Sequence, residues 1–264
     1  MIDPRAIVSP QAELAADVSV GPFSIVGAGV EIGPRTVIGP HAVVNGPATI
    51  GADNRIFQFA SIGDEPQDKK HQGEPTRLEI GDRNVFRESC TINRGTARDK
   101  GVTRIGNDNL FMAFSHVAHD CAIGDHTVFA NCASLGGHVE IGDYAIIGGN
   151  SAVHQFVRIG KQVMVGGMTG VENDVIPYAT VTGNRAHLSG LNLIGLKRRG
   201  FSREDIHDLR NAYRMLFAPE GTMAERLEEV ANQYRDCAPA MEIVDFIRAD
   251  SSRAVCQPQL ENAA

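Results

Sequence analysis

The 264-residue sequence predicts a mainly β protein, in which short parallel strands coil into a prism and a small helical region follows. Three observations support this prediction: a six-residue hydrophobic period, an excess of glycine, and a change to helical periodicity near residue 190. The chain contains 28 glycines and no tryptophan. Self-similarity at a fixed short period is typical of a repeat architecture.

The six-residue period occurs in two long runs. The first run is aliphatic at Ile2, Val8, Leu14, Val20, Val26, Ile32, Ile38, Val44, Ile50, Ile56 and Ile62. The second run begins at Ile105 and reaches Val171, with an aliphatic residue or Phe at every sixth position. This period fits neither a helix nor a long strand, but it suits a short strand with an inward side chain followed by a corner. Three such sides close one triangular coil, and stacked coils hydrogen-bond at a spacing of about 4.8 Å.

Two polar insertions interrupt the repeat. One separates Ile62 from Ile80, and the other separates Ile92 from Ile105, where the six-residue frame shifts by one. Insertions in a solenoid are extruded as loops, often at the binding face. We therefore expect a β-helix over residues 1–190 with extruded loops at about 64–78 and 94–103.

Helical signals replace the repeat in the C-terminal part of the chain, residues 191–264. Ser202 can cap a helix that carries a stripe of apolar residues. Thr222 and Glu225 form a capping box before a second helix, and Pro239 can open a third. The sequence therefore predicts a small C-terminal helical domain.

Composition and charge exclude several classes of protein. The formal net charge is −7, whereas a binder of duplex nucleic acid or of anionic membrane surfaces needs a broad basic surface. No apolar run approaches the roughly 20 residues of a membrane span. The N-terminus shows no secretory signal, and the five cysteines include no CxxC pair. We expect a cytoplasmic protein with reduced thiols, no membrane span and no nucleic-acid partner.

Five of the nine histidines fall close together in the chain: His116, His119, His126, His138 and His154. Three six-residue sides make a coil of 18 residues. This length places His119 one coil below Gly137, and Asp120 one coil below His138. A carboxylate beside an imidazole can orient a general base, and a glycine N–H at a corner can stabilise an oxyanion. The alternative is that these are ordinary corner residues, because adjacent side chains on a strand normally point apart.

Other motifs are weaker. His116 and His119 are spaced poorly for a metal pair on a strand, and the glycines at 27–33 lack the third spacing and the βαβ unit of a dinucleotide site. Basic clusters lie at Lys69–Lys70 and at 197–203. They are either solvated surface charge or a means of recognising phosphate.

Several stretches resemble one family of acyltransferases. They are Asn45-Gly46, FQFASIGDEPQD, GEPTRLEIGDRN, RESCTINRGT, DNLFMAFSHVAHDC, GGHVEIGDYAIIGG, AVHQFVRIG, VMVGG and GLKRRGFSRE. They are similar to the acyl-[acyl-carrier-protein]–UDP-N-acetylglucosamine O-acyltransferases, which catalyse the first committed step of lipid A synthesis. The resemblance covers nearly the whole chain, including the helical tail. It implies a left-handed parallel β-helix, although the general rule for parallel crossovers favours the right hand.

The resemblance also implies a homotrimer with active sites in clefts between subunits. His119 would be the general base for the 3-hydroxyl of the glucosamine, Asp120 would orient it, and the Gly137 N–H would face the thioester oxyanion. The implied substrate-binding residues are Asp68, Lys70, Asn93, His116, His138, His154, Gln155, Gly167, Asn192, Arg198 and Arg199. The tail helices and nearby basic residues would dock the acidic acyl carrier protein. No metal and no redox cofactor is expected.

Three positions affect the expected specificity. Asn93 stands where the family usually has a histidine, which leaves acyl transfer to a 3-amino variant of the sugar as an alternative. Ile194 replaces an acidic residue that many relatives carry near the nucleotide. Gly167 leaves room for a long acyl chain, whereas Met168 beside it could shorten the groove.

Three other functions remain alternatives. The first is the later N-acyltransferase of the same pathway, which carries an extra N-terminal domain, whereas the repeat here begins at Ile2. The second is a coenzyme A acetyltransferase, but these enzymes share only the hexapeptide core and lack the tail motif found here. A non-catalytic β-helix scaffold is the alternative outside the enzymes.

Overall fold

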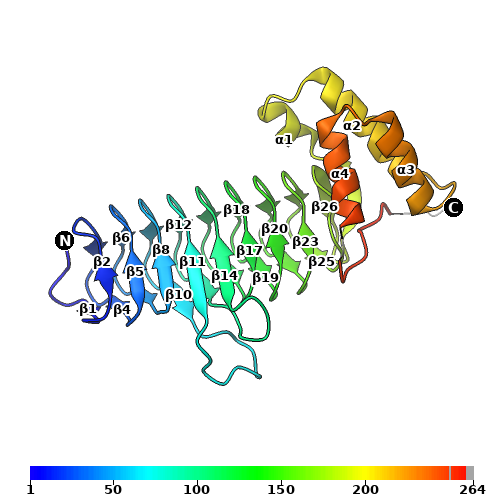
Figure 1. The fold of residues 1–264 in the computed structure, drawn as a ribbon. Helices are drawn as coiled ribbons and strands as arrows, with labels where there is room; N and C mark the ends of the chain where they lie inside the picture. Colours follow the sequence, from blue (N-terminus) through cyan, green and yellow to red (C-terminus); the bar gives the residue numbers. More distant parts are fainter. Residues whose placement is uncertain (250, 260–264) are drawn as a thin grey trace.

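The computed structural model describes residues 1–249 and 251–259. These residues form a long three-sided prism of stacked coils, with the N-terminus at one end and a group of helices at the other (Figure 1). Every coil except the last contributes one strand to each of three sheets, and all neighbouring strands are parallel except the last pair.

We call the three sheets the first, second and third faces, in the order in which the chain visits them. The first face contains β1 (Ile7–Val8), β4 (Ile25–Val26), β7 (Val43–Val44), β10 (Ser61–Asp64), β13 (Thr91–Asn93), β16 (His116–Val117), β19 (Ser134–Leu135), β22 (Ala152–Val153) and β25 (Gly170–Val171). The second face contains β2 (Glu13–Leu14), β5 (Val30–Ile32), β8 (Ala48–Ile50), β11 (Arg77–Ile80), β14 (Val102–Ile105), β17 (Ala122–Ile123), β20 (Glu140–Ile141) and β23 (Arg158–Ile159). The third face contains β3 (Ser19–Val20), β6 (Val37–Ile38), β9 (Arg55–Ile56), β12 (Val85–Phe86), β15 (Leu110–Phe111), β18 (Val128–Phe129), β21 (Ile146–Ile147), β24 (Met164–Val165), β26 (Ala179–Thr182) and β27 (His187–Leu191).

The residues of the six-residue period point into the prism, as the pattern predicts. Ile62, Phe111 and Val165 are fully buried, and each stacks on the equivalent residue of the next coil. Phe111 lies between Phe86 and Phe129 at ring-centroid distances of 4.9 and 4.7 Å. A continuous apolar column therefore holds the coils together.

Three edges separate the faces. The first edge joins the first and second faces, the second edge joins the second and third, and the third edge joins the third and first. Both extruded loops leave the prism at the first edge and span residues 65–76 and 94–101. These loops are shorter than the predicted 64–78 and 94–103. Arg77 pairs with Val102 and Leu78 with Thr103, so residues that look like loop in the sequence extend β11 and β14.

Four helices follow the β-helix: α1 (Leu193–Arg198), α2 (Arg203–Leu216), α3 (Met223–Gln233) and α4 (Ala238–Arg248). Ser202 and Thr222 form the N-terminal caps of α2 and α3, each in a reciprocal capping box, and Pro239 lies in the first turn of α4. The sequence did not predict α1. It is only six residues long, and Asn192 caps it by accepting from the Gly195 N–H.

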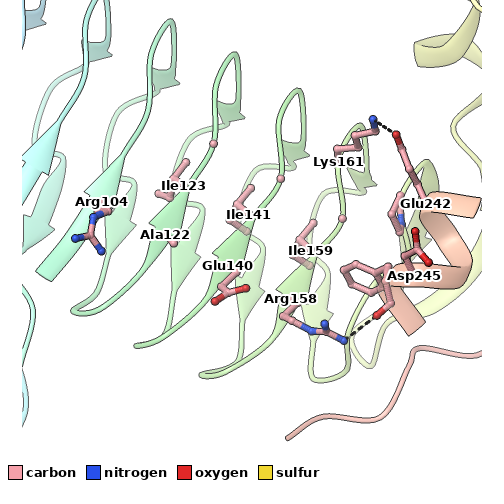
Figure 2. Close-up of a pocket in the computed structure, with 15 residues that line it drawn as sticks. Arg104, Ala122, Ile123, Glu140, Ile141, Arg158, Ile159, Lys161, Glu242 and Asp245 are labelled. Carbon is pink, nitrogen blue, oxygen red and sulfur yellow. Dashed lines mark hydrogen bonds and ion pairs between the residues drawn. The ribbon is translucent and has the colours of Figure 1, made fainter. Parts of the chain in front are cut away.

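Helix α4 is fixed to the last coils of the second face (Figure 2). Lys161 Nζ lies 2.6 Å from a Glu242 carboxylate oxygen, and the Tyr178 hydroxyl donates to the same carboxylate. Arg158 donates to the Phe246 carbonyl at 3.2 Å and lies over the Phe246 ring. These contacts join the helical region to the β-helix.

The segment after α4 is not helical, which corrects the prediction of a helical domain over 191–264. Val255 pairs with Asp174 and Pro258 with Leu188, so this segment returns to the β-helix. Residue 250 and residues 260–264 of the predicted domain lie outside the described residues. No helix within the described ranges has the length and apolar character needed to cross a membrane.

Candidate active site

His119 and Asp120 meet at a corner of the first edge. His119 Nδ1 lies 2.9 Å from Asp120 Oδ2, although the residues are adjacent in the chain. Asp120 has a φ of +59°, which is the left-handed region. This conformation turns the backbone at the corner, where the strand alternation that would direct the two side chains apart does not apply.

The Asp120 carboxylate is buried and fully engaged. The Thr96 N–H donates to both of its oxygens at 3.0 Å, and the Thr96 hydroxyl donates to Oδ2 at 2.6 Å. Burial raises the pKa of Asp120, but the hydrogen bonds from His119 and Thr96 together outweigh burial and hold that pKa below its usual value. An ionised carboxylate only accepts hydrogen bonds, so His119 Nδ1 carries the proton and Nε2 keeps a free lone pair.

Gly137 lies directly over the His119 ring, one coil further along. A Cβ atom at Gly137 would lie 2.5 Å from His119 Cε1 and 2.8 Å from Nε2. Any side chain at this position would displace the imidazole. Among the described residues, no backbone acceptor bonds the Gly137 N–H, so this donor is available beside His119 Nε2.

His138 extends the cluster along the first edge. Its Nδ1 lies 2.7 Å from Asp99 Oδ2, and its ring packs edge-on against His119 at a centroid distance of 5.0 Å. Phe156 of the next coil stacks on His138 at 4.3 Å. Asp99 belongs to the 94–101 loop, which therefore contributes directly to the cluster.

Other predicted residues lie near the same edge. Gln155 continues the column of His119 and Gly137, and His154 precedes it at the corner. His116 projects from the first face, with Nδ1 2.7 Å from the Thr91 hydroxyl. Burial, and then the positive charge that His119 can carry, lower the pKa of His116, which favours a neutral imidazole.

The first loop brings its predicted residues to this edge as well. Asp68 accepts from the Lys70 N–H at 3.0 Å, and the Lys70 side chain is exposed. Asn93 is buried, and its amide donates to the Glu65 carbonyl at 2.8 Å. Asn93 therefore ties the start of the 94–101 loop to the 65–76 loop.

Four predicted residues do not join this group within one chain. Asn192 and Arg199 lie at the second edge, where Asn192 donates to the Gln162 carbonyl and Arg199 to the Tyr144 carbonyl. Arg198 is exposed at the end of α1, beside Arg199. Gly167 lies at the third edge, where a Cβ atom would meet only the Gly149 carbonyl oxygen, at 3.4 Å.

Two hollows lie on the surface near these residues. One of about 490 Å³ is lined by the 98–100 part of the second loop, by His138, Phe156 and Arg158, and by Ser251 and Ser252. A larger one of about 710 Å³ lies between the second face and α4, and the first-edge histidines are not part of its lining (Figure 2). We place the candidate site at the smaller hollow because the polar cluster adjoins it.

His119, Asp120 and His138 also have the donor atoms of a metal site, within 4.8 Å of one another. Their chemistry fits this role poorly. Both imidazoles direct Nδ1 at carboxylates, and the Asp120 oxygens already accept three hydrogen bonds from Thr96. The donor set therefore suits a hydrogen-bonded acid–base pair better than a cation.

The sequence reasoning missed three residues of the site: Thr96, Asp99 and Arg253. The first two lie in the extruded loop, and the Arg253 guanidinium lies 2.7 Å from His154 Nδ1. The insertion after Ile92 was a signal for the loop, but the sequence held no signal that the C-terminal segment reaches His154.

Comparison with known proteins identifies the family. The chain is 55% identical over 260 residues to the acyl-[acyl-carrier-protein]–UDP-N-acetylglucosamine O-acyltransferase of Caulobacter vibrioides, covering 98% of this chain and 99% of that protein. It is 50% identical to the protein of the same name from Halorhodospira halophila, over 93% of this chain and 95% of that one. The chain belongs to this family of acyltransferases.

Family models and solved structures agree with this assignment. Residues 174–256 match the model for domain 2 of UDP-N-acetylglucosamine O-acyltransferase, and residues 12–46 and 103–137 match the bacterial transferase hexapeptide model. The Francisella novicida UDP-N-acetylglucosamine acyltransferase superposes with a TM-score of 0.95 at 38% identity, covering 98% of this chain and 95% of that one. The Moraxella catarrhalis O-acyltransferase gives 0.94 at 44% identity, over 97% and 99% of the two chains. The fold is the left-handed parallel β-helix with C-terminal helices, as the resemblance implied.

Proposed function

We propose that this acyltransferase moves an (R)-3-hydroxyacyl chain from acyl carrier protein to the 3-hydroxyl of UDP-N-acetylglucosamine, as the first step of lipid A biosynthesis. The relatives' names specify the donor and the acceptor. The observation that supports the chemistry is the His119–Asp120–Gly137 arrangement. It combines a free imidazole lone pair with an available backbone N–H.

The proposed reaction is a direct acyl transfer. His119 Nε2 removes the proton of the sugar 3-hydroxyl as its oxygen attacks the thioester carbonyl. Asp120, held by Thr96, keeps the proton on Nδ1 and stabilises the imidazolium that forms. The Gly137 N–H donates to the developing oxyanion, and collapse of the tetrahedral intermediate breaks the C–S bond. His119 returns its proton to the departing thiolate, giving the O-acyl sugar nucleotide and the free carrier thiol.

The remaining predicted residues would bind the substrates. Lys70 and Asp68 extend from the first-edge loop toward the sugar nucleotide, with His116, His138, His154, Gln155 and Asn93 along the cleft. Asn192, Arg198 and Arg199 would hold the uridine and the phosphates, and Gly167 would lie at the closed end of the acyl groove. Asn192, Arg198, Arg199 and Gly167 lie at other edges than His119, so the proposal includes a homotrimer whose sites are shared between neighbouring subunits. The proposed location of the protein is the cytoplasm.

The test is an acyl-transfer assay with purified protein, UDP-N-acetylglucosamine and 3-hydroxyacyl carrier proteins of several chain lengths. We expect transfer with the wild type and a loss of about 10²–10⁴-fold in kcat for His119→Ala. His41→Ala is the matched control, because His41 stacks between Phe23 and Phe59 in the N-terminal coils, away from the site. Absence of transfer at every chain length would refute the function. Full activity of His119→Ala would refute the assignment of His119 as the general base.

A parallel assay with the 3-amino sugar nucleotide measures the effect of Asn93 on acceptor choice.

A further inference from the structure

The C-terminal segment Ser251–Cys256, which we call the strap, is built into the β-helix beside the candidate site. The Asp174 N–H donates to the Ala254 carbonyl at 2.9 Å, and the Cys256 N–H donates to the Asp174 carbonyl at 2.8 Å. Cys256 is buried, and its thiol donates to the Ala186 carbonyl. The strap therefore occupies a defined position on the last coils.

Asp174 anchors the strap through its side chain as well. This carboxylate is fully buried and accepts from the Arg158 N–H at 2.8 Å, from Arg158 Nε at 2.7 Å and from the Ser251 hydroxyl at 2.6 Å. The Ser251 hydroxyl oxygen in turn accepts from the Arg253 N–H. One buried charge thus fixes the backbone from which the Arg253 side chain extends.

Arg253 Nη2 lies 2.7 Å from His154 Nδ1. A guanidinium only donates, so Nδ1 must accept and carry no proton. The competing contact, from Nδ1 to the Gln155 carbonyl at 3.3 Å, would require a proton on Nδ1, and it is much longer. The geometry therefore selects the neutral tautomer of His154 with its proton on Nε2.

We propose that Arg253 is a positioning residue that holds His154 as a neutral hydrogen-bond donor, through its Nε2–H, toward an acceptor oxygen of the sugar nucleotide. The role of His154 toward the substrate rests on the proposed function, whereas its tautomer does not. The strap also supplies Ser251 and Ser252 to the wall of the 490 Å³ hollow that His138 lines. The strap is therefore part of the site.

The experiment uses the full chain with Arg253→Met, which keeps the length of the side chain but removes its donors. Histidine labelled with ¹⁵N, with the His154→Gln spectrum used for assignment, reports the tautomer above the pH range in which histidine is protonated. We expect the Nε2–H form in the wild type and a shift toward the Nδ1–H form in Arg253→Met, because the Gln155 carbonyl then becomes the available partner. The KM for the sugar nucleotide should rise about tenfold, with kcat changed less than about twofold.

Two further variants complete the design. Arg253→Lys retains a cationic donor and should restore both the tautomer and part of the KM. Arg5→Met removes a charge from the N-terminal coil, where Arg5 pairs with Asp3, and should change neither. An Nδ1–H form in the wild type, or an unchanged tautomer in Arg253→Met, would overturn the assignment. An altered tautomer with an unchanged KM would overturn the role in substrate binding. If the wild type transfers no acyl group, the proposed function fails while the tautomer result still stands.

Discussion

At the scale of single residues, the corner conformation explains how neighbouring side chains cooperate. Asp120 and His138 both adopt the left-handed region, with φ of +59° and +64°, and both occupy the same position of successive coils. Left-handed φ is unfavourable for a residue with a side chain, so the stacked coils must stabilise it. The corner conformation brings Asp120 beside His119, the residue that precedes it. It also stacks His138 on Phe156 of the next coil.

His116 makes the stability of the protein depend on pH. Because the pKa of His116 is lowered from its usual value of 6.5 in the folded state, the unfolded chain takes up a proton more readily. The stabilising effect of the neutral His116 imidazole is complete above pH 6.5 and is lost as the pH falls through the lower pKa of the folded state. We expect the unfolding free energy to fall more for the wild type than for His116→Gln between about pH 7.5 and about pH 5. Urea unfolding at both pH values measures this difference. His207→Gln, an exposed change on α2, should behave as the wild type does, and equal slopes for His116→Gln would contradict the prediction.

Coil arithmetic predicted the stacking of Gly137 on His119 because that contact depends only on the period of the repeat. The contacts of Thr96 with Asp120 and of Asp99 with His138 depend on how the 94–101 loop closes, and loop closure has no period. Arg253 is separated from His154 by 99 residues, and its position depends on the buried Asp174. Residues that repeat in the sequence were therefore predictable, whereas residues placed by an insertion or by the chain end were not.

At the scale of elements, the glycines after the inward aliphatic residues act by their lack of a side chain rather than by their backbone freedom. A Cβ atom at Gly81 would lie 2.7 Å from the Gly106 carbonyl oxygen of the next coil, and one at Gly33 would lie 2.7 Å from the Gly51 carbonyl carbon. Many of the left-handed corners are instead occupied by residues with side chains, such as Phe59, Asp108 and Tyr144. The glycine excess in the sequence thus indicates close stacking of coils.

Replacing one of these glycines should separate two coils. We expect Gly81→Ala to lower the unfolding free energy by about 2 kcal/mol, because backbone atoms in contact cannot move aside as a flexible side chain can. Gly149→Ala is the control, since its Cβ atom would meet nothing closer than 3.4 Å and its φ is not left-handed. Its effect should stay within about 0.5 kcal/mol. Urea unfolding followed by circular dichroism compares the two, and equal stability would contradict the steric role of Gly81.

At the scale of the whole molecule, the three edges of the prism separate the predicted functions. The acid–base cluster and both extruded loops lie at the first edge, the residues assigned to the uridine and the phosphates at the second, and Gly167 at the third. A side chain at one edge cannot reach across a face of the same prism. A second copy can bring its second edge beside the first edge of its neighbour, and a closed ring of three copies repeats this contact at every interface.

This arrangement predicts that two inactive variants restore each other. His119→Ala lacks the base, and Arg198→Ala/Arg199→Ala lacks the nucleotide-binding cations, so each should be nearly inactive alone. When the two chains are co-expressed and assemble at random, about a quarter of the interfaces should combine an intact first edge with an intact second edge. Purification through a different tag on each chain keeps only the mixed trimers, in which one interface of three is intact on both sides. Acyl transfer by this material should therefore recover to about a third of the wild-type rate. Co-expression of His119→Ala with the chain that carries all three substitutions is the control, because no interface can then supply His119. No recovery in the mixture would mean that each site is built within a single chain, and activity in the control would mean that the reaction does not need His119.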